Sequence, residues 1–144
     1  MNRSMPSSTV IPVLGYRDVR EAVTWLCRAF GFVERLRIGD HRAQLVVGDG
    51  SVVVTGLPGG GEAAGPPGSS VMVRVTGIDA HFERAAEAGA KVLSPPADYR
   101  YGERQYTVAD PGGQVWTFSE SVADIDPSDW GGELLTPPRS PRPR

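Results

Sequence analysis

Apolar and polar positions along the chain follow an order that occurs twice. Val10–Tyr16 is rich in apolar and β-branched residues and predicts a strand, in which Pro12 indicates an edge or strand-start position. An amphipathic helix is predicted next, because apolar residues recur there at helical spacing. These residues are Val19, Val23, Leu26 and Phe30. Asp18 and Glu21 have the spacing of an N-terminal capping box, and Gly31 ends the helix.

Three further strands complete the first half. They are predicted at Phe32–Ile38, His41–Val47 and Ser51–Thr55. Short turn sequences, Gly39-Asp40 and Gly48-Asp49-Gly50, separate them. The first half is therefore strand, helix and three strands.

The same order restarts after a stretch rich in glycine and proline. A strand is predicted at Ser70–Val75, followed by a helix that contains Ile78 and Phe82 and ends at Gly89. A short strand at Lys91–Leu93 leads into a predicted loop, Ser94–Asp98. Two strands that form a hairpin follow, at Arg104–Ala109 and Gln114–Ser119.

Duplication of this unit predicts the domain organisation. We expect a flexible N-terminus (1–8), a first βαβββ unit (9–56), a linker (57–69), a second unit (70–120) and a C-terminal tail rich in proline and arginine (121–144). The expected fold class is α+β, with two curved mixed sheets that form a trough or cleft and helices outside. A trough of this kind is a natural small-molecule site.

Composition narrows the classes of function. Hydrophobic residues make up 40% of the chain and charged residues 22%, as in globular proteins. The net charge of -2 provides no overall basic field for nucleic acid, and no long apolar run predicts a membrane span or signal peptide. Cys27 is the single cysteine and falls in the apolar helical pattern, so we expect a small core residue. A reducing cytoplasm is the expected location.

The paired pattern resembles the vicinal oxygen chelate superfamily, which contains glyoxalase I, extradiol dioxygenases and bleomycin resistance proteins. The resemblance covers roughly residues 9–120, and three stretches carry it: IPVLGYRDVREAVTWLCRAFGF, VMVRVTGIDAHFERAAEAGAKV and YGERQYTVADPGGQVWTF. The G-x-R run followed by D-P-x-G and an apolar strand is its most specific part. The fold alone does not give the activity, because it hosts lyases, isomerases, dioxygenases and plain binders.

The metal ligands of this superfamily have no counterpart here. The resemblance places the four ligand positions at Ile11, Val54, Ser70 and Thr117. Isoleucine and valine have no lone pairs, whereas a divalent metal needs several imidazoles or carboxylates. Glu120 lies three residues past Thr117, so strand alternation directs it to the opposite face, where we expect a solvated carboxylate. No metal and no cofactor are expected.

The candidate ligand-binding residues are polar or aromatic groups near the expected trough. They are His41, Gln44, Arg104, Tyr106 and Thr117. His41 and Arg104 follow equivalent turns and would anchor the two ends of a ligand. Alternatively, Arg104 pairs with Asp110 or Glu103 and only holds the hairpin.

Other side chains are expected to be structural. If Thr117 faces the trough, Trp116 and Phe118 lie in the core. His81 is expected on the exposed surface of the second helix, and Trp25 is either helix core or a dimer contact.

Three functions fit these observations. The first is a metal-free protein, resembling the bleomycin resistance branch, that sequesters an antibiotic-like or metabolite ligand; the resemblance implies a homodimer. The second is a metal-independent lyase or isomerase, for which His41, Glu103 and Tyr106 are the acid/base candidates. The third is a scaffold domain without a ligand. Whether the chain is an enzyme stays open, and no nucleic acid or membrane partner is expected.

Overall fold

The computed structural model describes residues 3–57 and 68–135. The first unit consists of β1 (Val13–Tyr16), α1 (Val19–Phe30), β2 (Val33–Ile38), β3 (Arg42–Val47) and β4 (Gly50–Gly56). The second consists of β5 (Val71–Arg74), α2 (Ile78–Glu87), β6 (Lys91–Tyr99), β7 (Glu103–Ala109) and β8 (Val115–Ser121). A 3-10 helix follows at Pro127–Trp130. Most of the expected linker, and the end of the expected tail, lie outside the described residues.

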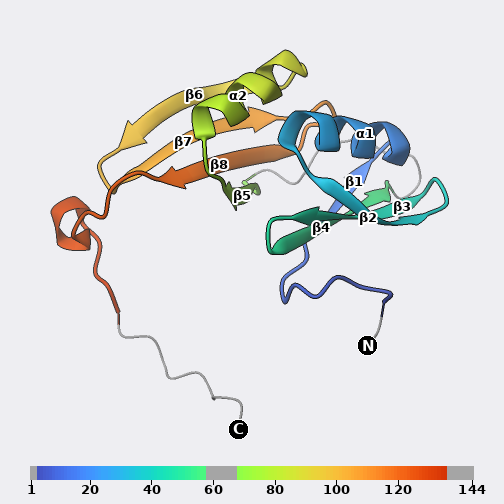
Figure 1. The fold of residues 1–144 in the computed structure, drawn as a ribbon, viewed down its shortest axis with the longest axis horizontal. Helices are drawn as coiled ribbons and strands as arrows, with labels where there is room; N and C mark the ends of the chain where they lie inside the picture. Colours follow the sequence, from blue (N-terminus) through green and yellow to red (C-terminus); the bar gives the residue numbers. More distant parts are fainter. Residues whose placement is uncertain (1–2, 58–67, 136–144) are drawn as a thin grey trace, which may run out of the picture.

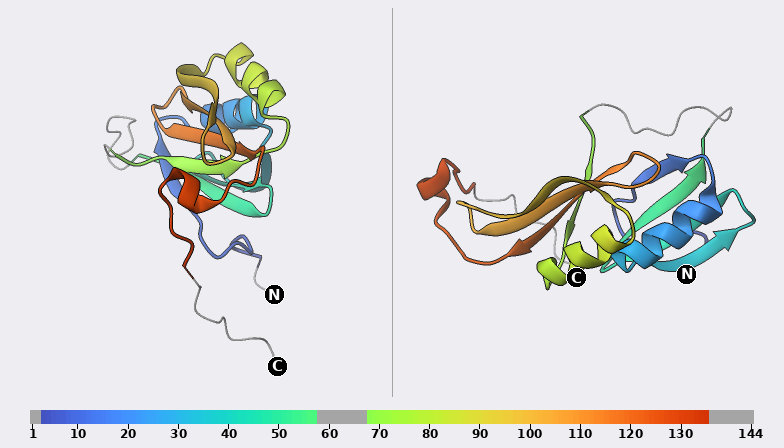
Figure 2. Two further views of the ribbon diagram at one scale, coloured as in Figure 1. Left: turned by 90° about the vertical axis from the view of Figure 1, so that its left-hand side faces the viewer. Right: turned by 90° about the horizontal axis from the view of Figure 1, so that it is seen from above.

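Two four-stranded mixed sheets have the same topology. Their strand orders are β1-β4-β3-β2 and β5-β8-β7-β6, and β1 and β5 each run parallel to the last strand of their own unit. The predicted α+β fold of two tandem βαβββ units is confirmed. Both helices lie on one side of the sheets (Figures 1 and 2), so each sheet has a helix side and an opposite side, here named its open face.

Helix α1 forms where its capping residues and apolar stripe predict. Asp18 Oδ1 accepts the N–H of Glu21 at 3.0 Å, and Gly31 ends the helix at a φ of 78°, which only glycine adopts without strain. The buried stripe consists of Val19, Val23, Leu26, Ala29 and Phe30. Burial of each large apolar side chain stabilises the fold by roughly 1.5–3 kcal/mol. Cys27 packs partly buried against this core, as expected.

Helix α2 is capped by a residue from another strand. The N-cap residue of α2 is Gly77, which has no side chain that could cap the helix. Instead the Glu120 carboxylate accepts the N–H groups of Gly77 at 3.0 Å and Ile78 at 3.1 Å. The prediction that Glu120 lies opposite Thr117 is confirmed, but the prediction of a solvated carboxylate is wrong. Alternation directs Glu120 to the helix side, where the unpaired N–H groups of α2 need an acceptor.

Strand β6 is longer than predicted. The segment Ser94–Asp98, expected to be a loop, belongs to β6 and pairs with β7. Two register shifts, between Val92 and Ser94 and between Ser94 and Ala97, accommodate the two prolines. Proline is tolerated because β6 is an edge strand and the shifts leave some of its positions unpaired.

Contacts between α1 and α2 join the two units. Trp25 Nε1 donates to the Ala88 carbonyl at 2.7 Å, and Arg84 Nε donates to the Arg28 carbonyl at 2.7 Å. Trp25, for which helix core and dimer contact were both open, thus packs against the second unit of its own chain. The guanidinium of Arg84 satisfies a carbonyl at the C-terminal end of α1, which the helix itself leaves unpaired.

His81 is also part of this contact, so the prediction of an exposed histidine is wrong. Its Nδ1 lies 2.5 Å from Tyr106 Oη, and its Nε2 lies 3.2 Å from the Phe30 carbonyl oxygen. The ring stacks on Phe30 and contacts Phe118. Sequence reasoning failed here because Phe30 of the first unit, together with Tyr106 and Phe118 of the second, covers the ring in place of solvent. Desolvation lowers the pKa of His81.

The predicted core residues of β8 are confirmed. Trp116 and Phe118 are fully buried on the helix side. Within the described ranges, neither helix has the length and apolar character needed to cross a membrane.

Candidate functional site

A cleft of about 590 Å³ lies on the open face of the second sheet. Strands β5, β7 and β8 form its floor, and the segment that leads from β8 to the 3-10 helix forms its wall. It is lined by Met72, Arg74, Tyr101, Gly102, Glu103, Ser119, Ser121, Ala123, Asp124, Ile125, Pro127 and Trp130.

Strand β5 contributes the side chains of Arg74 and Met72 to the cleft. Val71 and Val73 pack on the helix-side core, so alternation directs Met72 and Arg74 to the open face. Both side chains are exposed. Among the described residues, Arg74 forms no ion pair and no side-chain hydrogen bond. Its guanidinium is therefore available to a ligand with a negative or carbonyl oxygen.

Glu103 is held in a hydrogen-bonded network on the cleft floor. Ser119 Oγ donates to its Oε1 at 2.6 Å, and Gln105 Nε2 donates to the same oxygen at 3.0 Å. On the same face, the hydroxyls of Thr107 and Thr117 lie 2.9 Å apart. These bonds fix the polar side chains of β7 and β8 before any ligand arrives, which lowers the entropic cost of binding.

Two aromatic side chains, Tyr101 and Trp130, line the cleft, and Tyr99 supports Tyr101 from behind. Tyr99 and Tyr101 stack at 5.4 Å, and the ring of Trp130 meets Tyr101 edge-on at 5.7 Å. Burial, and then the Glu103 carboxylate, raise the pKa of Tyr101, so its hydroxyl stays protonated at neutral pH. Gly102 allows the wall to close, because its carbonyl accepts the N–H groups of Val122 and Ala123 and a Cβ at this position would clash with Ala123.

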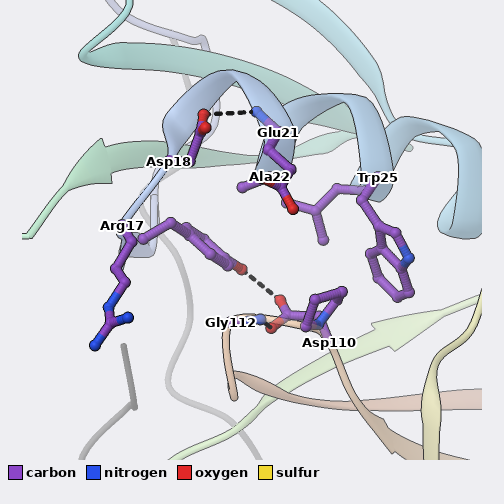
Figure 3. A pocket seen from close by; sticks show the side chains of 10 residues that line it. Arg17, Asp18, Glu21, Ala22, Trp25, Asp110 and Gly112 are labelled. Carbon is purple, nitrogen blue, oxygen red and sulfur yellow. Dashed lines mark hydrogen bonds between the residues drawn. The ribbon is translucent and has the colours of Figure 1, made fainter. Parts of the chain in front are cut away.

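A smaller crevice of about 240 Å³ lies between the start of α1 and the turn after β7 (Figure 3). Asp110 stands at its base and accepts four hydrogen bonds. Their donors are the Tyr16 hydroxyl, the Trp116 indole and the backbone N–H groups of Gly112 and Gln114. All four donors belong to the protein itself, so this carboxylate is already paired. The crevice therefore has fewer free polar groups for a ligand than the larger cleft does.

The turn Asp110–Gly113 therefore has a structural role. Burial raises the pKa of Asp110, and the hydrogen bonds from Tyr16, Trp116, Gln114 and Gly112 oppose that rise. A Cβ on Gly112 would lie 2.5 Å from the ring of Tyr16, so the turn needs glycine there.

The ligand positions implied by the superfamily resemblance do not suit a metal. Val54 pairs with Leu14 and is fully buried on the helix side, whereas Val53 faces the open side. The counterpart of Thr117 in the first unit is thus Val53, and the predicted equivalence with Val54 is off by one residue. A set of Ile11, Val53, Ser70 and Thr117 has too few donors for a divalent ion. Nor do the described residues include any group of three histidine, cysteine or acidic side chains able to hold one.

The five candidate ligand-binding residues do not lie together. Thr117 lies on the open face of the second sheet, while Gln44 lies on that of the first and is 4% exposed. His41 is exposed at the turn between β2 and β3. Tyr106 is fully buried in the core against His81.

Arg104, the fifth, lies beside α2. It pairs with Asp79 at 2.9 Å and Asp98 at 3.1 Å. The geometry therefore favours the alternative in which Arg104 forms ion pairs within the protein, although its partners are not Asp110 or Glu103.

Sequence reasoning missed the residues that give the cleft its character. Alternation of Met72 and Arg74 with Val71 and Val73 was a signal that β5 has a polar open face. No comparable signal pointed to Trp130, because its position depends on how the chain returns after β8.

Comparison with known proteins identifies relatives of the whole fold. Residues 10–118 match the family model described as Glyoxalase/Bleomycin resistance protein/Dioxygenase superfamily. The crystal structure of TioX from Micromonospora sp. ML1 is similar at 38% identity and a TM-score of 0.67, covering 80% of this chain and 99% of that one. A glyoxalase/bleomycin resistance protein/dioxygenase from Nocardioides aligns with a TM-score of 0.64 at 23% identity, over 94% of this chain and 93% of that one.

A curated relative comes from Mycobacterium tuberculosis (strain ATCC 25618 / H37Rv). This uncharacterized protein is 30% identical over 128 residues, covering 80% of this chain and 75% of its own length.

Proposed function

Because the chain belongs to the glyoxalase/bleomycin resistance protein/dioxygenase superfamily, we propose that it is a metal-free small-molecule-binding protein whose ligand occupies the cleft on the second sheet. The observation that carries the proposal is the preorganised cleft with Arg74 unpaired among the described residues. Tyr101 and Trp130 in its lining favour a ligand with a flat apolar part, and Arg74 favours an oxygen acceptor on the same molecule. An antibiotic-like compound or a metabolite has this amphipathic character.

Trp130 makes ligand binding measurable. Of the three tryptophans, Trp116 is in the core and Trp25 lines the smaller crevice, so Trp130 is the reporter for the cleft. Amphipathic antibiotics and aromatic metabolites would be screened by thermal shift, and hits titrated by tryptophan fluorescence. We expect Trp130→Phe to abolish the fluorescence change and Trp25→Phe to retain it. The reverse result would move the site to the smaller crevice.

Arg74 provides a second test with a matched control. We expect Arg74→Ala to weaken binding of a hit by about tenfold, the loss of one charge-assisted hydrogen bond. Arg37→Ala removes another exposed arginine, which pairs with Asp40 on the first unit, and should leave affinity unchanged. Equal affinity of wild type and Arg74→Ala would contradict the proposed site.

The metal-free character has its own measurement. We expect elemental analysis of the purified protein to find no stoichiometric metal, and thermal melts to be unaffected by Zn²⁺, Ni²⁺, Mn²⁺ or a chelator. Stoichiometric metal, or a melt that shifts with chelator, would overturn this part of the proposal.

A homodimer is proposed together with this function. Apolar side chains on both open faces support it: Val13 is 55% exposed, Val33 63% and Met72 62%. Exposed apolar surface of this kind is often covered by a partner subunit. Analytical ultracentrifugation would test it, because a monomer at micromolar concentration contradicts the dimer.

A metal-independent lyase or isomerase is the alternative. Of its acid/base candidates, Glu103 alone lines the cleft, since Tyr106 is buried and His41 lies on the first unit. This alternative requires turnover of a bound hit and its loss in Glu103→Gln with binding retained. Binding without turnover favours the binder.

A further inference from the structure

The N-terminal segment, residues 3–8, lies on the open face of the first sheet (Figure 1). The Arg3 carbonyl accepts Arg35 Nη2 at 3.0 Å, and the Ser4 carbonyl accepts Gln44 Nε2 at 2.8 Å. Ser8 Oγ donates to Ser51 Oγ at 2.8 Å. Between these contacts, Pro6 is buried. The segment therefore occupies a specific place through three hydrogen bonds and one buried ring.

Burial of the sheet residues distinguishes the two units. Ser51 and Val53 alternate with the helix-side core residues of β4 and so face the open side, yet they are only 8% and 4% exposed. Thr117, the counterpart of Val53 in the second unit, is partly exposed. Residues 3–8 thus cover the centre of the first open face, at Ser51 and Val53 of β4, while Val13 and Val33 on its edge strands stay exposed. The open face of the second sheet holds the cleft.

The hydrogen-bond donors of the first open face are arranged to bind amide carbonyls. Arg35 also donates to Gln44 Oε1, which orients the side-chain amide so that its NH₂ group is directed at the Ser4 carbonyl. With residues 3–8 in place Gln44 is 4% exposed, so any group that covers this face without supplying a carbonyl would leave a buried donor unsatisfied. Both contacts are to main-chain oxygens of consecutive residues, so they do not depend on those residues' side chains.

We propose that the open face of the first sheet is a binding site for extended, amide-rich ligands, namely peptides or peptide-like molecules with a proline-sized ring, and that residues 3–8 are its intramolecular occupant. A ligand in solution must displace this segment, whose effective concentration is on the order of millimolar because it is tethered nearby. The segment therefore lowers the apparent affinity of the site for free peptides. This site is separate from the cleft on the second sheet and does not depend on its function.

The test uses a fluorescently labelled peptide of residues 3–9 and full-length protein, with binding read by fluorescence anisotropy. In the double variant Pro6→Gly/Ser8→Ala, the tethered segment loses its buried ring and its hydroxyl contact while the sheet is unchanged. We expect this variant to bind the wild-type peptide at least about tenfold more tightly than the wild-type protein does. A labelled peptide with the Pro6→Gly and Ser8→Ala changes is the matched control and should bind more weakly.

Two sheet variants complete the test in the Pro6→Gly/Ser8→Ala background. Gln44→Leu should abolish peptide binding, and Arg35→Met, at an exposed position, should weaken it. Circular dichroism would establish that each variant is folded; if Gln44→Leu is not, Arg35→Met decides. Equal peptide affinity in the wild type and the double variant, or unchanged affinity in Arg35→Met, would overturn the proposal.

Discussion

The hydroxyl of Tyr16 in β1 donates a hydrogen bond of 2.5 Å to Asp110 Oδ2, although 94 residues separate the two in the chain. Both groups are buried, and the bond joins the first strand of one unit to the turn of the other. Burial and the neighbouring carboxylate raise the pKa of Tyr16 far above its ordinary value, so the phenol is a permanent donor. The D-P-G-G turn therefore anchors the two units to each other.

Removal of the Asp110 carboxylate should destabilise the whole fold. Asp110→Ala leaves four donors without an acceptor, and we expect the free energy of unfolding to fall by at least about 3 kcal/mol, since each orphaned group costs about 1–3 kcal/mol. Tyr16→Phe removes one donor and should cost about 1–2 kcal/mol. Urea denaturation measures both.

Asp49 provides the matched control for Asp110. It is the acidic residue of the equivalent turn in the first unit and is exposed. Asp49→Ala should change stability by less than about 0.5 kcal/mol. Equal effects of the two substitutions would contradict an anchoring role for Asp110.

Substitution of Gly112 should show how closely the turn approaches β1. Gly112→Ala places a Cβ 2.5 Å from the Tyr16 ring, and we expect a loss of about 1–3 kcal/mol from the strain. At Gly56 an added Cβ would meet no atom within 4 Å, so Gly56→Ala is the control. Thermal melts that do not distinguish the two variants would argue against this packing.

Glu120 should stabilise α2, although more than 40 residues of the chain separate it from the start of that helix. Glu120→Ala removes the acceptor for two N–H groups at the helix start, and we expect a loss of about 1–2 kcal/mol. Glu83→Ala, at an exposed position in α2, removes a carboxylate without that contact. Hydrogen exchange would detect faster exchange at the start of α2 only in the Glu120 variant; equal rates in both variants would be inconsistent with the cap.

Acidification should weaken the contact between the units at His81. Desolvation lowers the folded-state pKa of His81 below its ordinary value of 6.5, so the unfolded chain binds the proton more readily. The stability that neutral His81 contributes is complete above pH 6.5 and is lost as the pH falls through the folded-state value. Urea denaturation between pH 7.5 and about 5 should show this decline.

The two histidines allow a direct comparison. His81→Gln should flatten the decline in stability, whereas His41→Gln, at an exposed turn, should preserve it. If stability still declines to the same extent in His81→Gln as the pH falls, the decline comes from other titratable groups.

Local pattern was sufficient to predict the repeated elements of this protein. Asp18 and the apolar stripe of α1 are neighbours in sequence, and period-two alternation in β8 placed Trp116 and Phe118 in the core and Glu120 on the same side. These predictions succeeded because capping, helical spacing and strand alternation act over a few residues. For the same reason, the chemistry of the superfamily's metal positions could be judged from residue types alone.

The contacts that those elements make with distant parts of the chain were decided only by the tertiary structure. His81 was predicted to be exposed from its place on the second helix beside Phe82 and Glu83, but Phe30 and Tyr106 cover it from elsewhere in the chain. The two open faces differ because residues 3–8 lie on one and the segment ending at Trp130 borders the other. Contacts between distant segments depend on how the chain packs as a whole, and no local pattern records them.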